Sequence, residues 1–138
     1  MSLGAIFGNS TIPILEQVVS FAQDRHEVLA GNIANLDTPG YQTRDLSPQK
    51  FQEQLKAAIA RRDTGPVSDS LGDPSRFRSD PFRDVAKNRN GILFHDQSNV
   101  GLEQQITELG KNQGTHNQAI ALLTHQFRLL SVAISERV

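Results

Sequence analysis

The stretch that decides the fold is LEQQITELGKNQGTHNQAIALLTHQFRLLSVAI, residues 102–134. Its residues step by fours and threes through Leu102, Ile106, Leu109, Gln113, His116, Ile120, Leu123, Phe127, Leu130 and Ile134, and eight of these ten are apolar. A 3.5-residue period kept over four heptads is typical of a helix that packs along another helix. We therefore expect a C-terminal helix over residues 99–136, about 55 Å long.

A second apolar stripe lies near the N-terminus and supplies a partner helix. It runs through Ile12, Leu15, Val19, Ala22, His26, Leu29, Ile33 and Leu36. The pattern predicts an amphipathic helix over 11–36, which Thr11 can cap and which tolerates Pro13 only because that proline falls in the first turn. We expect a mainly α fold in which the two long terminal helices pair as an elongated antiparallel coiled-coil-like bundle.

The residues expected to form the seam of this helix pair, called the assembly seam below, are apolar members of the two stripes. They are Leu15, Val19, Ala22, Leu29, Ile33, Leu36, Leu102, Ile106, Leu109, Ile120, Leu123, Phe127, Leu130 and Ile134. One helix pair cannot cover all sides of its helices. We expect part of both stripes to stay uncovered until other subunits cover it.

The remaining segments are expected to be shorter or irregular. Residues 1–10 form a flexible N-terminus, 37–46 a turn, and 47–62 a short helix that Ser47 and Pro48 begin. Residues 63–98 are expected to be a variable, loop-rich insert with little β structure. Its Phe77, Phe82 and Val85 can dock locally, and a short strand follows Asn90-Gly91. The whole is interpreted as a single axial domain built from both ends of the chain.

Composition excludes several classes of function. The 138 residues carry 14 basic and 15 acidic side chains, a net charge of −1, which argues against a nucleic-acid partner. There is no cysteine, which excludes thiolate metal sites and thiol nucleophiles. No apolar run is long enough to span a membrane, and residues 1–10 lack the basic and apolar regions of a secretory signal peptide.

Candidate catalytic and metal-binding residues are few. The nucleotide-binding and hydrolase motifs that place phosphate-binding glycines or a nucleophile are absent from the sequence. His116 and His125 are nine residues apart and lie on nearly opposite helix faces, so they cannot share a metal. His26 and His116 interrupt the two stripes and can face each other, where a hydrogen-bonded pair more often fixes register than binds an ion. We expect no cofactor, metal or small-molecule substrate.

The string GNIANLDTPGY, residues 31–41, is the most specific in the chain. Pro39 and Gly40 suit the central positions of a type II turn, because glycine supplies the positive φ. Asn32 and Asn35 place amides where the last helical carbonyls lack partners. Tyr41 offers a large anchor beyond the turn.

The string resembles the Ala-Asn-x-Ala-Asn-x-x-Thr-Pro-Gly-Tyr signature of the bacterial flagellar rod and hook axial proteins. The matching positions, including Gly31 in place of the usual Ala, are Gly31, Asn32, Ala34, Asn35, Thr38, Pro39, Gly40 and Tyr41. Gly31 and Ala34 are small enough for another backbone to approach. Residues 96–103 and 109–134 are similar to the proximal-rod members of that family, which have about this length.

The resemblance implies a structural subunit, not an enzyme, of the flagellar basal-body rod. Such subunits pair their terminal helices, stack into a hollow drive shaft that crosses the periplasm, and leave the cell through type III export without a cleaved signal peptide. The implied partners are copies of itself, other rod subunits, and the export apparatus or basal-body ring proteins. The alternative interpretation is a generic coiled-coil adaptor or secretion-related helical protein, which would not need the Thr-Pro-Gly-Tyr turn.

Overall fold

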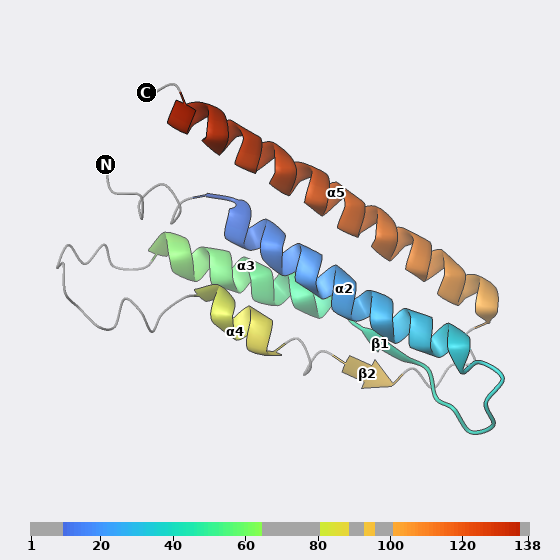
Figure 1. Cartoon of the computed structure of the whole chain (residues 1–138). Helices are drawn as coiled ribbons and strands as arrows, with labels where there is room; N and C mark the ends of the chain where they lie inside the picture. The colour runs from blue at the N-terminus through green and yellow to red at the C-terminus, as the bar shows by residue number, and fades with distance from the viewer. Residues whose placement is uncertain (1–9, 65–80, 89–92, 96–100, 136–138) are drawn as a thin grey trace.

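The computed structural model describes residues 10–64, 81–88, 93–95 and 101–135. Along the chain the elements are α2 (Ile12–Ala34), β1 (Arg44–Leu46), α3 (Pro48–Thr64), α4 (Pro81–Asn88), β2 (Leu93–His95) and α5 (Leu102–Ser135). Helices α2 and α5 lie side by side and run antiparallel (Figure 1). The predicted mainly α fold with paired terminal helices is confirmed.

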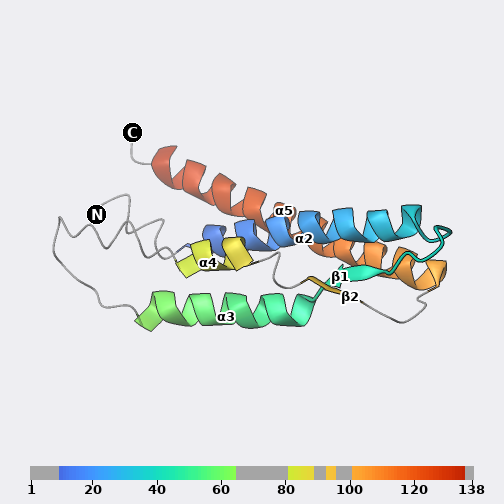
Figure 2. The same cartoon turned by 90° about the horizontal axis from the view of Figure 1, so that it is seen from below.

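Helix α2 occupies the centre of the molecule. Helix α5 lies on one side of α2, and α3 and α4 lie on the other (Figure 1); seen from below, α5 crosses behind α2 (Figure 2). Thr11 stands at the N-cap of α2, but its side chain makes no capping hydrogen bond; its carbonyl accepts one from the Leu15 N–H at 3.0 Å. The expected side-chain cap is therefore wrong. Pro13 lies in the first turn as expected, where its missing N–H leaves no helical bond unmade.

Helix α3 begins where the Ser47-Pro48 pair predicts, and the Ser47 hydroxyl accepts a hydrogen bond from the Lys50 N–H at 3.3 Å. The helix ends at Thr64, two residues later than expected. Its Phe51 ring stacks on the Phe21 ring of α2, with centroids 4.1 Å apart and planes 7° apart. This stack fastens α3 to the side of α2 that faces away from α5.

The apolar core lies between α2, α3 and α4 and not between α2 and α5. Its buried members are Phe21, Leu46, Phe51, Ala58, Phe82 and Val85. The docking expected of Phe82 and Val85 is confirmed, whereas Phe77 lies outside the described residues. Part of the segment expected to be a loop is thus the helix α4. Its two buried residues are three positions apart and share one helix face, which a loop pattern rich in charge conceals.

Strands β1 and β2 form a short antiparallel pair. Arg44 pairs with His95, Asp45 with Phe94 and Leu46 with Leu93. The strand expected after Asn90-Gly91 is present as β2, while β1 lies in the segment 37–46 that was expected to be a turn throughout. Within the described residues no helix is both long and apolar enough to cross a membrane.

Helix α5 extends well beyond its partner. It has 34 residues against 23 in α2, and its buried residues are Gln105, Asn112 and Ala119. From Ile120 to Ser135 every residue of α5 is exposed or only partly covered within the described structure. The C-terminal half of α5 therefore projects along the molecule with much of its surface open (Figure 1).

The glycines of α5 offer a test of helix stability. A Cβ added at Gly114 would meet no atom within 4 Å. Because glycine costs a helix interior about 1 kcal/mol relative to alanine, Gly114→Ala should raise the free energy of unfolding by up to about 1 kcal/mol in urea denaturation. The matched change Gly40→Ala should lower it by about 1–2 kcal/mol, since Gly40 has φ +77°. Destabilisation by Gly114→Ala would show that the neighbourhood of α5 is more crowded than described.

Candidate functional site

The turn after α2 forms as the sequence predicts. The Tyr41 N–H donates to the Thr38 carbonyl at 3.1 Å, which closes a turn with Pro39 and Gly40 at its centre. Gly40 has φ +77°, so a residue without a Cβ is favoured there. The Asn35 amide donates to the Gly31 carbonyl at 2.8 Å and thus satisfies a late helical acceptor as expected.

Asn32 has a different role from the one expected. Its side chain is fully buried and does not bond the end of its own helix. Its amide nitrogen donates to the Arg44 carbonyl at 2.6 Å and to the Gln105 side chain at 3.2 Å. Its oxygen accepts from the Arg44 N–H and the Tyr41 hydroxyl, both at 3.1 Å. Two donors and two acceptor sites are thus all used, and one amide joins α2, the turn, β1 and α5.

Arg25 connects α2, β1 and α5 from a position seven residues before Asn32. Its guanidinium donates to both carboxylate oxygens of Asp45, at 2.9 and 2.7 Å, and to Glu108 at 3.0 Å. Burial lowers the pKa of Arg25, but the bonds and charges of Asp45 and Glu108 raise it overall. The hydrogen bonds from Lys111 and Arg25 hold the pKa of Glu108 below its ordinary value. A two-pronged bond of this kind fixes both distance and orientation.

A third polar contact completes the α2–α5 interface. The Asn112 amide donates to the Ala22 carbonyl at 2.7 Å, and both residues are buried. Ala22 and Ala119 are small, which lets the helices approach closely here. The interface between the terminal helices therefore includes directional polar contacts and small side chains beside the buried Leu29. We call the contacts of Arg25, Asn32, Gln105, Glu108 and Asn112 the polar ladder.

The polar ladder displaces the residues of the assembly seam from the centre of the helix pair. Ala22 and Leu29 are buried, and Leu15, Val19, Ile33, Leu109, Leu123 and Leu130 are partly buried. The others are exposed by 37–62%, namely Leu36, Leu102, Ile106, Ile120, Phe127 and Ile134. The residues of α5 that are buried against the rest of the chain are Gln105, Asn112 and Ala119. Each of them lies one position before a residue of the predicted apolar stripe, namely Ile106, Gln113 and Ile120.

The close approach expected at Gly31 and Ala34 is not seen within the described part of the chain. A Cβ at Gly31 would meet no atom within 4 Å, and Ala34 is exposed. No backbone of the described ranges takes the space that these two small residues leave. Within the described residues, Gly31 therefore does not admit another segment of the chain.

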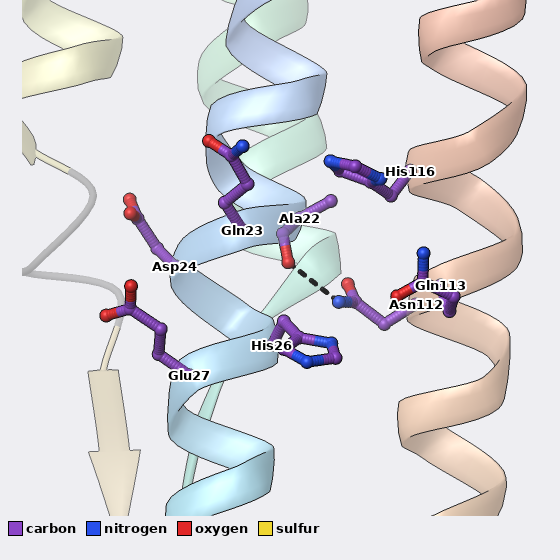
Figure 3. A pocket seen from close by; sticks show the side chains of 8 residues that line it. All are labelled: Ala22, Gln23, Asp24, His26, Glu27, Asn112, Gln113 and His116. Atoms are coloured by element: carbon purple, nitrogen blue, oxygen red, sulfur yellow. Dashed lines mark hydrogen bonds between the residues drawn. The ribbon is translucent and has the colours of Figure 1, made fainter.

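His26 and His116 line one cleft between α2 and α5, of about 450 Å³, as Figure 3 shows. Both ring nitrogens of His116 are buried and find no hydrogen-bond partner among the described residues. The hydrogen bond expected of a seam histidine is therefore not made by His116 to any described residue. Asp24 and Glu27 lie at the same cleft, but the described residues hold no group of three or more side chains placed to bind a metal.

Comparison with known proteins adds to this geometry. A family profile described as "Flagella basal body rod protein" matches residues 20–42, which contain Arg25, Asn32 and the turn. The chain is 31% identical to the flagellar basal body rod protein FlgB of Aquifex aeolicus over 102 residues, 74% of each chain. The chain belongs to the FlgB family of flagellar basal-body rod proteins.

Other relatives support this assignment over more of the chain. The FlgB protein of Bacillus subtilis is 28% identical over 133 residues, 92% of this chain and 95% of the relative. The FlgB protein of Salmonella typhimurium is 29% identical over 119 residues, 82% of this chain and 84% of the relative. No solved structure matches the chain. The protein is thus a structural subunit of the flagellar basal-body rod that assembles with other rod subunits, and it is not an enzyme.

The sequence did hold a signal for the polar ladder. Arg25 and Asn32 are seven residues apart on α2, and Gln105 and Asn112 are seven apart on α5. A polar residue repeated once per heptad on each of two helices indicates a polar line, because such residues share one side of a helix. The stronger apolar line beside it on α5 hid this signal.

Replacement of Asn32 tests the polar ladder. Asn32→Ala leaves the Arg44 backbone groups, Tyr41 and Gln105 without this partner inside the structure. A buried polar group without a partner costs about 1–3 kcal/mol, so the free energy of unfolding should fall by at least about 2 kcal/mol in urea denaturation. Asn35→Ala is the matched control and should cost about 1 kcal/mol or less, because only the bond to the Gly31 carbonyl and a long, exposed bond from the Thr38 hydroxyl at 3.5 Å are lost. Equal losses in the two variants would contradict the central role of Asn32.

The lowered pKa of Glu108 predicts a pH dependence of stability. The folded chain binds the proton of Glu108 less tightly than the unfolded chain does. The contribution of Glu108 is therefore complete above its unfolded-state pKa and is lost as the pH falls through its folded-state pKa. Glu108→Gln should weaken the loss of stability on acidification, measured by urea denaturation between neutral pH and pH values below the ordinary glutamate range. Glu53→Gln, at an exposed position on α3, should leave the pH profile unchanged.

Proposed function

We propose that this rod subunit assembles through apolar side chains of α5 that the single chain leaves exposed, with copies of itself and with other subunits as neighbours. One observation carries the proposal. Among the described residues, nine large apolar side chains are more than a third exposed, and eight of them belong to α5. Apolar side chains gathered in this way on one element mark an interaction surface.

These side chains lie on more than one side of α5, which suits contacts with more than one neighbour. Leu122, Leu129 and Val132 are exposed by 48, 51 and 49% and form what we call the outer stripe. With about 100° per residue, the outer stripe lies roughly a third of a turn from the side that carries Asn112 and Ala119. Helix α2 cannot cover it, so a separate chain is needed.

Three of the exposed members of the assembly seam form a further strip along α5 from its N-terminus to its middle. They are Leu102, Ile106 and Ile120, exposed by 46, 53 and 42%. Full burial of a leucine or isoleucine side chain contributes about 1.5–3 kcal/mol, so covering residues that are half exposed contributes on the order of 1 kcal/mol each. Contacts of this size become strong only when many repeat. An interface that joins different faces of identical subunits without closing a ring repeats along a helical filament.

The polar ladder supports the assembly by giving each subunit one fixed helix pair. Buried, directional contacts specify register better than apolar contacts do, although they need not add stability. We propose that the ladder keeps α5 antiparallel to α2 in every subunit, so that the outer stripe is always presented in the same direction. The resemblance to proximal-rod members supports a place in the proximal part of the hollow rod.

Three finer aspects of this function rest on the resemblance alone. We propose export through the flagellar type III apparatus without a cleaved signal peptide, with localisation to the periplasm-spanning rod. We propose also that the subunit meets the export apparatus or a basal-body ring protein.

Charge placed on the outer stripe tests the proposed assembly surface. Leu129→Asp should abolish rod formation, because a carboxylate without a partner is costly in an apolar interface. The readouts are basal bodies in electron micrographs and the spreading of cells in soft agar. Gln52→Asp, at an exposed position on α3 outside both proposed contact surfaces, is the control and should leave both readouts near those of the parent chain.

Two further measurements separate assembly from export and folding. The amount of Leu129→Asp protein outside the cytoplasm reports on export, and circular dichroism of the purified variant reports on folding. The proposal predicts that both equal the parent values while rods are missing. Normal rods built from Leu129→Asp protein would overturn the proposed role of the outer stripe.

A further inference from the structure

The part of α5 beyond α2 carries a second apolar surface, distinct from the outer stripe. Phe127, Leu130, Ser131 and Ile134 line a hollow of about 310 Å³. Phe127 and Ile134 are exposed by 47 and 62% in the described structure. We call this surface the terminal groove. None of its four side chains carries a charge.

The terminal groove continues the side of α5 that faces α2. Leu123 and Leu130 follow His116 at seven-residue steps, on the side where α2 packs. Such steps keep residues on one side of a helix, and Phe127 and Ile134 flank them. The terminal groove is thus a prolongation of the intramolecular interface past the first turn of α2. The outer stripe does not continue this interface.

The polar ladder fixes which residues stand opposite this groove. Ala22 faces Asn112, and Arg25 faces Glu108. Both helices rise about 1.5 Å per residue in opposite directions, so Ile12 stands opposite roughly residue 122. By the same register Ser10, the first described residue, stands opposite about residue 124 of α5. Residues 1–9 are therefore attached to the chain next to the groove.

The composition of residues 1–9 fits the groove. The sequence MSLGAIFGN contains no charged side chain, and Leu3, Ile6 and Phe7 have the spacing of one helical face. Ser10, where the described chain begins, is held at the N-terminal end of α2 by a hydrogen bond from Arg62 to its carbonyl at 3.1 Å. Nine residues can span up to about 30 Å, whereas the groove is about 16 Å long between residues 123 and 134.

We infer that residues 1–9 dock into the terminal groove of their own chain. Pro13 lies in the first turn of α2 and disfavours a straight continuation of that helix. The segment therefore docks as an element of its own, with Ile6 and Phe7 against Leu130 and Phe127. Docking covers the groove in the single subunit and leaves the outer stripe for neighbours. The inference concerns the isolated chain and is independent of the proposed assembly surface.

Disulfide trapping tests this docking, because the chain has no cysteine of its own. The pair Ile6→Cys and Leu130→Cys should form a disulfide within one chain in dilute solution. The matched pair Ile6→Cys and Leu129→Cys places the second thiol on the outer stripe. We expect the first pair to close at least about tenfold faster, since docking raises the local concentration of the thiol only at the groove. Non-reducing electrophoresis separates bonds within a chain from bonds between chains.

A second measurement does not depend on forming a bond. Leu130→Cys alone should react several-fold faster with a thiol reagent when Ile6→Ser and Phe7→Ser are also present, and Leu129→Cys should not change. Disulfides only between chains would assign the groove to a second copy and overturn the inference. Equal rates for both cysteine pairs, or thiol reactivity insensitive to Ile6 and Phe7, would also overturn it. None of these results bears on Leu129→Asp and rod formation.

Discussion

The buried amide of Asn32 is the constraint on which the arrangement of the terminal helices depends. It uses all its hydrogen-bonding capacity on Arg44, Tyr41 and Gln105, so the end of α2, the turn, β1 and α5 are held in one relation. An apolar side chain at this position would allow many neighbouring registers of α5. The amide allows one, because a shift of α5 would leave buried polar groups without partners. Arg25 imposes the same condition one heptad away.

Much of the fold could be predicted from the sequence because helix periodicity extends over long segments. The bounds of α2 and α5, the first turn of α3 and the positive φ of Gly40 all follow from local rules about period, capping and glycine. The inward side of α5 could not be predicted in the same way. The apolar line through Ile106 and Ile120 is more prominent than the polar line through Gln105 and Asn112, and only the partner helix decides between them. The short helix α4 likewise depends on what Phe82 and Val85 meet.

In the candidate site, too, the contacts between neighbouring residues could be predicted from the sequence, and the contacts between distant residues could not. The motif over 31–41 was recognisable, and the bond from Asn35 to Gly31 follows from its position at a helix end. The partners of Asn32 lie up to 73 residues away along the chain, beyond any local pattern. The molecule also reverses a common distribution, with polar contacts between its two longest helices and apolar side chains open on α5. That reversal suits the assembly surface proposed on α5, because the exposed apolar side chains are then available to neighbouring subunits.

The overhang of α5 has a mechanical consequence. The polar ladder holds α5 only along its first half, so the second half of the helix is fixed at one end alone. A small tilt of α5 near Ala119 displaces the C-terminal end of the helix, about 24 Å away along its axis, by several ångströms. A helix that is held only at its N-terminal half lets one sequence meet neighbours at slightly different angles without disturbing the hydrogen bonds of the polar ladder.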